Sequence, residues 1–220
     1  MNPTPRPRVK ICCIGNAAEA RFAVEAGADA LGLVGAMPSG PGVIEDAAIA
    51  AIARSVPPAV ATFLLTSEQS APGIAAHHRL VNTTAVQIVD RLVQGTYAEL
   101  RAQMPGTKLV QVIHVRGPES LDEAARAAGE VDALLLDSGR PDLPLKELGG
   151  TGRRHDWRIS RRIREESPVP VFLAGGLRPE NVREAIEEVG PFAVDVCSGV
   201  RSAGRLDPSK LLAFFTAAGF

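Results

Sequence analysis

The stretch VFLAGGLRPENVREAIEE, residues 171–188, contains one complete strand-and-helix unit. Its apolar start predicts a buried strand over 171–176, the glycines and Pro179 predict a tight turn, and the remainder predicts a helix over 179–188. A short run that is almost wholly apolar is typical of a parallel strand covered on both faces. The stretch therefore predicts one βα unit of a parallel sheet.

The same alternation recurs along all 220 residues. Further strands are predicted at 9–14, 30–35, 59–66, 85–89, 109–115, 133–138 and 193–199, and further helices at 17–27, 44–55, 68–80, 96–103, 119–128, 156–166 and 208–217. Eight such units fit a compact α/β protein, the (β/α)8 or TIM barrel. We predict one domain over 1–220, with 1–8 a frayed terminus. The alternative, an open doubly wound sheet, lacks a GxGxxG turn after the first strand.

The composition limits the class of function. With 45% apolar residues, 22% charged residues and a formal net charge of −1, the chain predicts a globular protein without a nucleic-acid or membrane partner. No segment approaches the roughly 18 apolar residues of a spanning helix, so we expect a cytoplasmic protein. Three cysteines argue against a disulfide framework. No CxxC motif or nearby histidine accompanies Cys12 and Cys13, so we expect no metal site.

The two adjacent cysteines of the first strand are predicted to differ in role. Because side chains alternate across a strand, Lys10 and Cys12 share one face and Cys13 shares the other with apolar neighbours. The face with the lysine is expected to point into the lumen, and Cys13 to pack against the helices. The same alternation turns Asp195 of the neighbouring last strand inward, where it is a predicted partner for the charge of Lys10.

Polar and glycine-rich residues follow several strands at the end where a barrel carries its chemistry. Asp137 ends the strand at 133–138 on its inward face. The segments GGTG (149–152), LAGGLRPENV (173–182) and CSGVR (197–201) follow the last three strands. Glycine lets backbone N–H groups approach an anion closely, so together the three segments predict a phosphate site on one rim.

These residues carry a family resemblance. The motifs VKIC (9–12), GADALGLV (27–34), ALLLDS (133–138), GGTGRRHDW (149–157), LAGGLRPENV (173–182) and VDVCSGV (194–200) resemble those of phosphoribosylanthranilate isomerases, in order and at similar spacing from about residue 8 to residue 215. That family is a (β/α)8 barrel of tryptophan biosynthesis. It performs an Amadori rearrangement of a phosphoribosylated aromatic amine without cofactor or metal.

The resemblance implies that Cys12 is the general base and Asp137 the general acid. It implies that Asp195 contacts or orients the substrate. Lys10, on the same strand face as Cys12, is a candidate to stabilise its thiolate. It implies a phosphate held by backbone groups of Gly150, Thr151, Gly152, Gly175, Gly176, Ser198 and Gly199. The expected partner is a small phosphorylated sugar, and the expected assembly a monomer or homodimer.

The chain departs from the family at the amine end of the substrate. Cys13 replaces the glycine of KICGIT, and Gly42 stands where the arginine of an SPR motif meets the carboxylate of the amine. The family's QLHG is QIVD here, with Val89 and Asp90, and an acidic residue after SGV is replaced by Arg201.

Three hypotheses follow from these departures. In the first, the chain is a true isomerase in which another cation, Arg140, Arg153, Arg154 or Arg201, binds the carboxylate; Arg140 is our predicted substrate contact. In the second, a divergent relative isomerises another phosphoribosyl or phosphosugar compound. In the third, a phosphate-binding protein has lost catalysis, but binding alone requires neither Cys12 nor Asp137.

Overall fold

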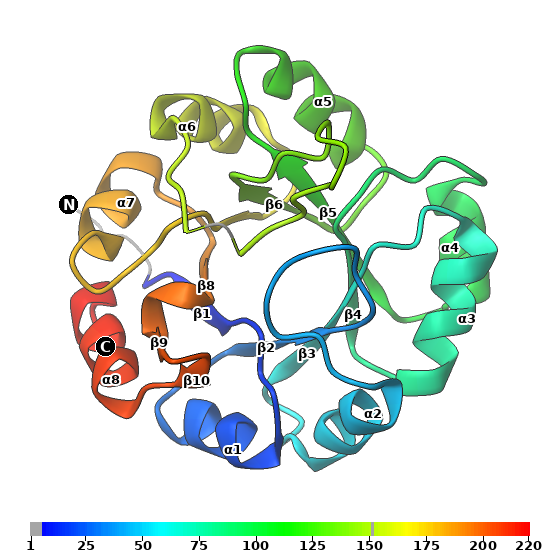
Figure 1. Cartoon of the computed structure of the whole chain (residues 1–220). Coiled ribbons are helices and arrows are strands. Elements are labelled where there is room, and N and C mark those ends of the chain that lie inside the picture. The colour runs from blue at the N-terminus through cyan, green and yellow to red at the C-terminus, as the bar shows by residue number, and fades with distance from the viewer. Residues whose placement is uncertain (1–5, 151) are drawn as a thin grey trace.

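The chain folds into a closed barrel of parallel strands surrounded by helices (Figure 1). This computed structural model describes residues 6–150 and 152–220. The barrel strands are β1 (Arg8–Ile11), β2 (Ala30–Val34), β3 (Ala61–Thr66), β4 (Ala85–Ile88), β5 (Lys108–His114), β6 (Ala133–Asp137), β7 (Val171–Leu173) and β8 (Ala193–Val196). The helices are α1 (Ala17–Glu25), α2 (Asp46–Ser55), α3 (Ala71–Val81), α4 (Tyr97–Gln103), α5 (Glu119–Ala128), α6 (Trp157–Glu166), α7 (Val182–Val189) and α8 (Pro208–Ala218). Each strand pairs with the next and β8 pairs with β1, so the predicted TIM barrel is confirmed.

Three strands end three residues earlier than their apolar runs predict. β1, β7 and β8 end at Ile11, Leu173 and Val196, where the sequence predicts 14, 176 and 199. The residues that follow form loops at the barrel mouth, and Cys13 among them has a φ of 62°. A short 3-10 helix, η1 (Ser198–Val200), follows β8. The alternation of side chains therefore stops before the last residues of these apolar runs.

A small hairpin that the sequence did not predict follows η1. Its strands are β9 (Arg201–Ser202) and β10 (Arg205–Leu206), which pair antiparallel. The turn residues Ala203 and Gly204 both have positive φ, 48° and 76°, as a two-residue hairpin turn of this hand requires.

The sequence predicted a frayed terminus over 1–8, but Arg6 and Arg8 at the end of this segment make defined contacts. The Arg6 guanidinium lies 3.4 Å from the centre of the Phe220 ring, and Arg8 pairs with Asp29 at 3.1 Å. Residues 1–5 lie outside the described residues. In the part of the chain that is described, no helix is long and apolar enough to cross a membrane.

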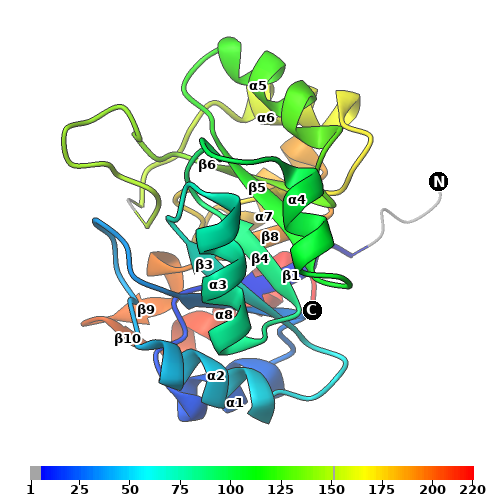
Figure 2. The same ribbon diagram turned by 90° about the vertical axis from the view of Figure 1, so that its right-hand side faces the viewer.

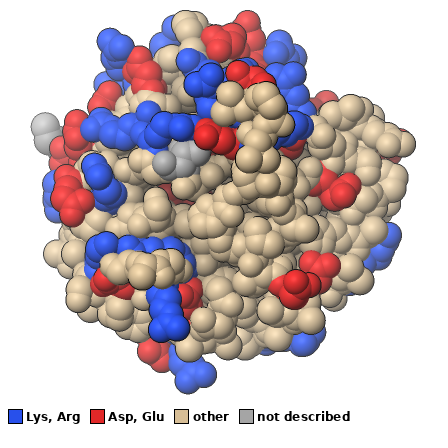
Figure 3. Space-filling view, viewed as in Figure 1, with Lys and Arg blue, Asp and Glu red and all other residues tan. Residues whose placement is uncertain are grey.

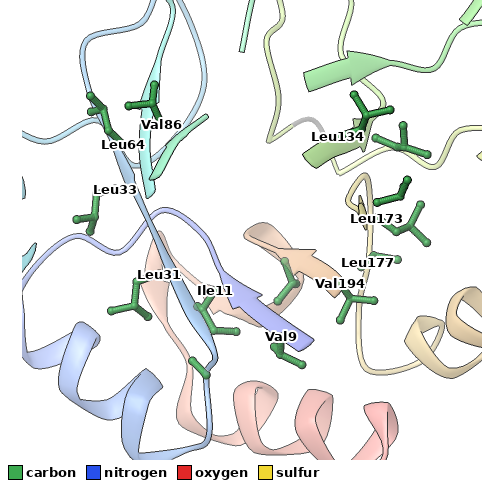
Figure 4. Packing of buried hydrophobic residues seen from close by; sticks show 14 of the residues in the cluster. Val9, Ile11, Leu31, Leu33, Leu64, Val86, Leu134, Leu173, Leu177 and Val194 are labelled. Atoms are coloured by element: carbon green, nitrogen blue, oxygen red, sulfur yellow. The ribbon is translucent and has the colours of Figure 1, made fainter. Parts of the chain in front are cut away.

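Two apolar layers hold the strands in place. The side chains labelled in Figure 4, such as Ile11 and Leu33, are buried in the layer between the strands and the helices. Residues of opposite parity fill the lumen, where the Phe63 and Phe172 rings pack edge to face with centroids 5.8 Å apart. Each fully buried Leu, Ile or Val contributes about 2 kcal/mol. The two layers therefore fix the strand ends at the mouth.

Two long loops extend from the same end of the barrel (Figure 2). One joins β2 to α2 and is called the βα2 loop (35–45); the other joins β6 to α6 and is called the βα6 loop (138–156). They touch, because Ser39 donates a hydrogen bond to the carbonyl of Lys146 and a Cβ on Gly150 would lie 2.5 Å from the Pro41 ring.

Candidate active site

A pocket opens at the carboxyl ends of the strands, beneath the βα2 and βα6 loops. The pocket and the open space at its mouth together measure about 660 Å³. Cys12, Asp137 and Asp195 all line it. The surface seen from this end is largely uncharged at its centre, with lysine and arginine gathered towards the rim (Figure 3). The three side chains that the sequence placed at the inner face or mouth of the barrel therefore line one pocket.

Beneath the floor of the pocket lies a buried ion pair, of which Asp195 lines the pocket and Lys10 does not. The Nζ of Lys10 lies 3.0 Å from Oδ1 of Asp195, and the Lys10 side chain is 0% exposed. The two residues are directly opposite in the β1 and β8 register, so their predicted pairing is confirmed. Burial acts to lower the pKa of Lys10, but the neighbouring Asp195 and Cys12 outweigh it and raise that pKa. Lys10 therefore stays protonated.

Cys12 lies immediately beside this lysine. A Cβ on Gly32 of β2 would lie 2.8 Å from Sγ of Cys12 and 3.0 Å from Nζ of Lys10, so both atoms approach the same point of β2. The backbone N–H of Cys12 donates to the carbonyl of Val196 at 2.8 Å and fixes the residue against β8. Gly32, which our sequence reasoning did not single out, provides the space for both side chains.

Cys13 corrects one prediction. We expected it to pack against the helices, yet it lines the pocket with Cys12 and belongs to the lumen layer. The reason is that β1 ends at Ile11, and at Cys13 the backbone is left-handed with φ 62°. Period-two alternation no longer applies there. A backbone position with positive φ favours glycine, and this explains why the resembling family has glycine at position 13.

Gly42 of the βα2 loop is held against Cys13. It has a φ of 81°, and a Cβ there would lie 2.5 Å from Cβ and 2.9 Å from Cα of Cys13. Any side chain at position 42 therefore collides with Cys13. The departures from the family pattern at positions 13 and 42 therefore concern two residues in contact with each other. An arginine substituted at position 42 alone would collide with Cys13.

Asp137 lies at the end of β6 beside an imidazole. Its Oδ1 accepts from the backbone N–H of Ser138 at 2.7 Å. Nδ1 of His155 is buried without a hydrogen-bond partner among the described residues, while its Nε2 pairs with Ser160 at 2.7 Å. A Cβ on Gly175 would lie 2.9 Å from that Nδ1 and 3.3 Å from Oδ1 of Asp137. Burial lowers the pKa of His155 to about 4, despite the charge of Asp137, so the ring is neutral near pH 7.

Sequence reasoning did not place His155 at this site. The sequence feature that could have pointed to it is a histidine directly before Asp156 and Trp157, at a position where the resembling family has an aromatic residue.

The predicted glycine-rich segments do converge on one rim. A Cβ on Gly176 would lie 2.8 Å from the carbonyl oxygens of Gly152 and Arg153, and a Cβ on Gly199 would lie 2.0 Å from the carbonyl of Leu177. The loops after β6, β7 and β8 therefore pack backbone to backbone. Within the described residues, the N–H groups of Gly175, Gly176, Ser198 and Gly199 have no hydrogen-bond partner in the protein. Such a set of unpaired N–H groups is what an anion requires. The predicted contact Thr151 lies outside the described residues.

The arginines proposed to bind the carboxylate of the substrate do not line the pocket. Arg140 is about half exposed, lies 3.6 Å from Asp142 and lines a separate surface hollow, which argues against its predicted contact with the substrate. Arg154 stacks on Trp157 with its Cζ 3.7 Å from the ring centre. Arg153 pairs with Glu147, and Arg201 pairs with Glu19 and the carbonyl of Cys13. Among the described residues no lysine or arginine lines the pocket.

In residues 6–150 and 152–220 no group of three or more His, Cys, Asp or Glu side chains is arranged to hold a metal ion.

Comparisons with known proteins agree with this geometry. A family model described as N-(5'-phosphoribosyl)anthranilate (PRA) isomerase matches residues 9–217. N-(5'-phosphoribosyl)anthranilate isomerase 2 of Methanosarcina mazei is 37% identical over 209 residues, which cover 94% of this chain and 92% of that protein. The isomerase of Haloarcula marismortui is 38% identical over 198 residues, covering 90% and 88%. The crystal structure of phosphoribosyl anthranilate isomerase from Thermotoga maritima matches with a TM-score of 0.80 and 31% identity, covering 96% of this chain and 98% of that one.

A further crystal structure of such an isomerase holds reduced 1-(o-carboxyphenylamino)-1-deoxyribulose 5-phosphate. It matches this chain with a TM-score of 0.78 and 29% identity, covering 96% of this chain and 98% of that one.

Proposed function

Because the chain belongs to the N-(5'-phosphoribosyl)anthranilate isomerase family, we propose that Cys12 and Asp137 perform the Amadori rearrangement of that family in this pocket. One observation carries the proposal. The thiol of Cys12, which is beside the buried ammonium group of Lys10, lines the same pocket as the carboxyl group of Asp137, and the glycine-rich loops lie between them. The substrate would be N-(5'-phosphoribosyl)anthranilate and the product 1-(carboxyphenylamino)-1-deoxyribulose 5-phosphate.

The first chemical step is acid catalysis by Asp137. Its protonated carboxyl group gives a proton to the furanose ring oxygen, and the bond between that oxygen and C1 breaks to leave an iminium ion. The neutral His155 ring beside Gly175 adds no positive charge next to the acid, so it does not favour early loss of the proton.

The second step is base catalysis by Cys12. Its thiolate removes the proton from C2 of the iminium, which gives an enolamine. The enolamine then becomes the ketone as its C2 hydroxyl loses a proton and C1 gains one. Lys10, held by Asp195, supplies the positive charge that stabilises the thiolate. An acid and a base with separate environments are what such a transfer needs.

Substrate binding divides between the two sides of the pocket. The backbone N–H groups of Gly175, Gly176, Ser198 and Gly199 would hold the phosphate, with Gly150 and Gly152 covering it from the βα6 loop. The opposite side is apolar and would receive the aromatic ring; it is formed by Val34, Met37, Leu65, Val89 and Leu148.

The experiment is a fluorescence assay of N-(5'-phosphoribosyl)anthranilate turnover by wild type, Cys12→Ser and Asp137→Asn. We expect each substitution to lower kcat by a factor of about 10² to 10⁴, the usual contribution of a positioned acid or base. Asp142→Asn is the matched control, because this carboxylate is on the loop that follows Asp137 but lies outside the pocket. A folded wild type without turnover, or retained activity in both active-site variants, would refute the proposal.

One observation favours a second, broader substrate choice. No lysine or arginine among the described residues lines the pocket, and Gly42 stands at the place of the family's arginine. An amine without a carboxylate is then a reasonable substrate. We expect kcat/KM for the N-(5'-phosphoribosyl) derivative of aniline to be within about tenfold of that for the anthranilate compound, since no ion pair worth about 1.4 kcal/mol or more is lost. A preference above a hundredfold for the carboxylated compound would exclude this second candidate.

A further inference from the structure

His77 of α3 lies beside the base of the βα2 loop, outside the pocket itself. α3 packs against α2, the helix into which this loop leads (Figure 1). The side chain of His77 is only 13% exposed. His77 is not one of the described residues that line the pocket, so it does not face a ligand bound there. Any effect of His77 on the site therefore passes through the segments that its ring contacts.

Both ring nitrogens of His77 have a hydrogen-bond partner. Nε2 lies 2.9 Å from Oδ1 of Asp46, the first residue of α2, and Nδ1 lies 3.2 Å from Oγ1 of Thr66 at the end of β3. Because a carboxylate can only accept, Nε2 donates to Asp46, and in the neutral ring Nδ1 then accepts from the Thr66 hydroxyl. That hydroxyl also accepts from the backbone N–H of Glu68 at 3.2 Å. Thr66 is buried, so the imidazole connects the start of α2 to the barrel wall.

The same ring fills the space over Gly35, the first residue of the βα2 loop. A Cβ on Gly35 would lie 2.5 Å from Cε1 and 2.9 Å from Nε2 of His77. Gly35 is not one of the glycines with positive φ, so the ring, and not the backbone conformation, is what requires glycine here. Since Asp46 directly follows the last residue of the loop, one imidazole contacts the chain at both ends of the βα2 loop.

The βα2 loop covers one side of the pocket. The loop residues that line the pocket are Met37, Ser39, Gly40 and Pro41. At the base of the loop, the N–H of Gly35 donates to the carbonyl of Leu65 and the N–H of Ile44 donates to the carbonyl of Val34, each at 3.0 Å. These two bonds lie between the ends that His77 contacts. Loss of the imidazole is therefore expected to loosen the base of the loop and, with it, the cover of the pocket.

We propose that His77 is a positioning residue that holds the βα2 loop over the amine end of the pocket. It acts through Gly35 and Asp46, and it touches neither the substrate nor the acid and base. This role rests on the proposed function for the substrate it concerns, whereas the contacts of the imidazole do not. Cys12 follows β1 and Asp137 ends β6, so both keep their places when the imidazole is lost. What changes is how firmly the loop encloses the aromatic ring.

The kinetic test compares two adjacent histidines of α3. We expect His77→Ala to raise KM for N-(5'-phosphoribosyl)anthranilate about tenfold and to change kcat by less than about threefold, because the loop adds binding that substrate and transition state share. The matched control is His78→Ala. His78 is buried and its Nε2 pairs with the carbonyl of Thr83, in the turn before β4, at 2.8 Å. This control removes the same ring from the same helix, and KM should stay within about twofold of wild type.

Hydrogen exchange of the loop amides, followed by NMR, supplies a readout that needs no turnover. We expect the amides of Gly35 and Ile44 to exchange about tenfold faster in His77→Ala than in wild type, and no faster in His78→Ala. Asp46→Asn keeps an oxygen that accepts from Nε2 and should resemble wild type, whereas Asp46→Ala should loosen the loop. Gly35→Ala keeps the imidazole but displaces it from the loop, so it should raise KM as His77→Ala does.

The two readouts separate this role from the proposed function. Faster exchange of the loop amides in His77→Ala, in a protein that turns over no N-(5'-phosphoribosyl)anthranilate, means that the proposed function fails while the hold of His77 on the loop stands. Loop exchange in His77→Ala equal to that of wild type overturns the inference. So does an equal rise of KM in His78→Ala, or a fall of kcat in His77→Ala with KM unchanged.

Discussion

The contact between Gly42 and Cys13 predicts that substitutions at these two positions have coupled effects on the free energy of unfolding. The size of the coupling follows from the structure. The perturbation is Gly42→Ala, made in wild type and in Cys13→Gly. The added Cβ would lie 2.5 Å from Cβ of Cys13, on a backbone with φ 81°. A left-handed backbone costs a non-glycine residue about 1 to 2 kcal/mol, and forcing an extra methyl into a filled site costs about 1 to 3 kcal/mol. We therefore expect a loss of about 2 to 5 kcal/mol in wild type.

Two comparisons separate these costs. Gly106 has nearly the same backbone, φ 85°, but a Cβ there would meet nothing within 4 Å, so Gly106→Ala measures the backbone cost alone, about 1 to 2 kcal/mol. In the Cys13→Gly background the close Cβ is gone, and the cost of Gly42→Ala is expected to fall by about 1 to 2 kcal/mol. The remaining approach to Cα, at 2.9 Å, keeps the relief partial.

The assay is urea unfolding at equilibrium for the four members of this cycle and for Gly106→Ala. Additive effects of the changes at positions 13 and 42, or a Gly42→Ala cost equal to that of Gly106→Ala, would refute the steric account. The same cycle, made with Gly42→Arg in place of Gly42→Ala, extends the test to substrate binding. We expect the arginine to be tolerated, and to favour the carboxylated substrate, only together with Cys13→Gly.

Three further predictions concern the floor and the rim of the site. Lys10→Met leaves the Asp195 carboxylate buried without its partner and should cost about 3 to 5 kcal/mol in urea unfolding, most of it recovered when Asp195→Leu is added; no recovery would contradict the pairing. His155 has a pKa lowered from 6.5 to about 4, so the unfolded chain binds the proton more readily, and stability should fall by about 2 to 3 kcal/mol as pH drops from 6.5 to 4. Subtracting the same pH profile for His155→Phe isolates this effect, and identical profiles would disprove it. Gly176→Ala, whose Cβ would lie 2.8 Å from the Arg153 carbonyl, should weaken the binding of inorganic phosphate at least tenfold in calorimetry, whereas Gly219→Ala, which meets nothing within 4 Å, should not.

Much of the site could be predicted from the sequence because a parallel barrel brings every strand end to one rim. Strand parity, together with the adjacency of the first and last strands in a closed barrel, places Lys10 beside Asp195, and the two form the ion pair at 3.0 Å. Asp137 was likewise placed at the mouth, which it lines. Both results depend on residues that lie within strands, where side-chain direction follows from position.

Loop residues escaped the same reasoning. Arg140 is three residues beyond the end of β6, and nothing in the sequence shows that the loop carries it away from the pocket to Asp142. His155 is far from Asp137 along the chain and reaches it only because the loop returns over Gly175. In both cases the path of the loop, set by backbone packing, decides the outcome.

The adjacent cysteines show where strand parity ends and why that matters for substrate choice. The apolar run continues to Ile14, but the strand does not, and the left-handed backbone at Cys13 puts its side chain where the βα2 loop must pass. Glycine at position 13 would remove the closer of the two contacts, with Cβ at 2.5 Å, and leave the approach to Cα at 2.9 Å; with cysteine at position 13, a side chain at position 42 meets both. The loss of the family's arginine is therefore coupled to the gain of a thiol. The same cysteine also places a second thiol in the pocket that Cys12 lines.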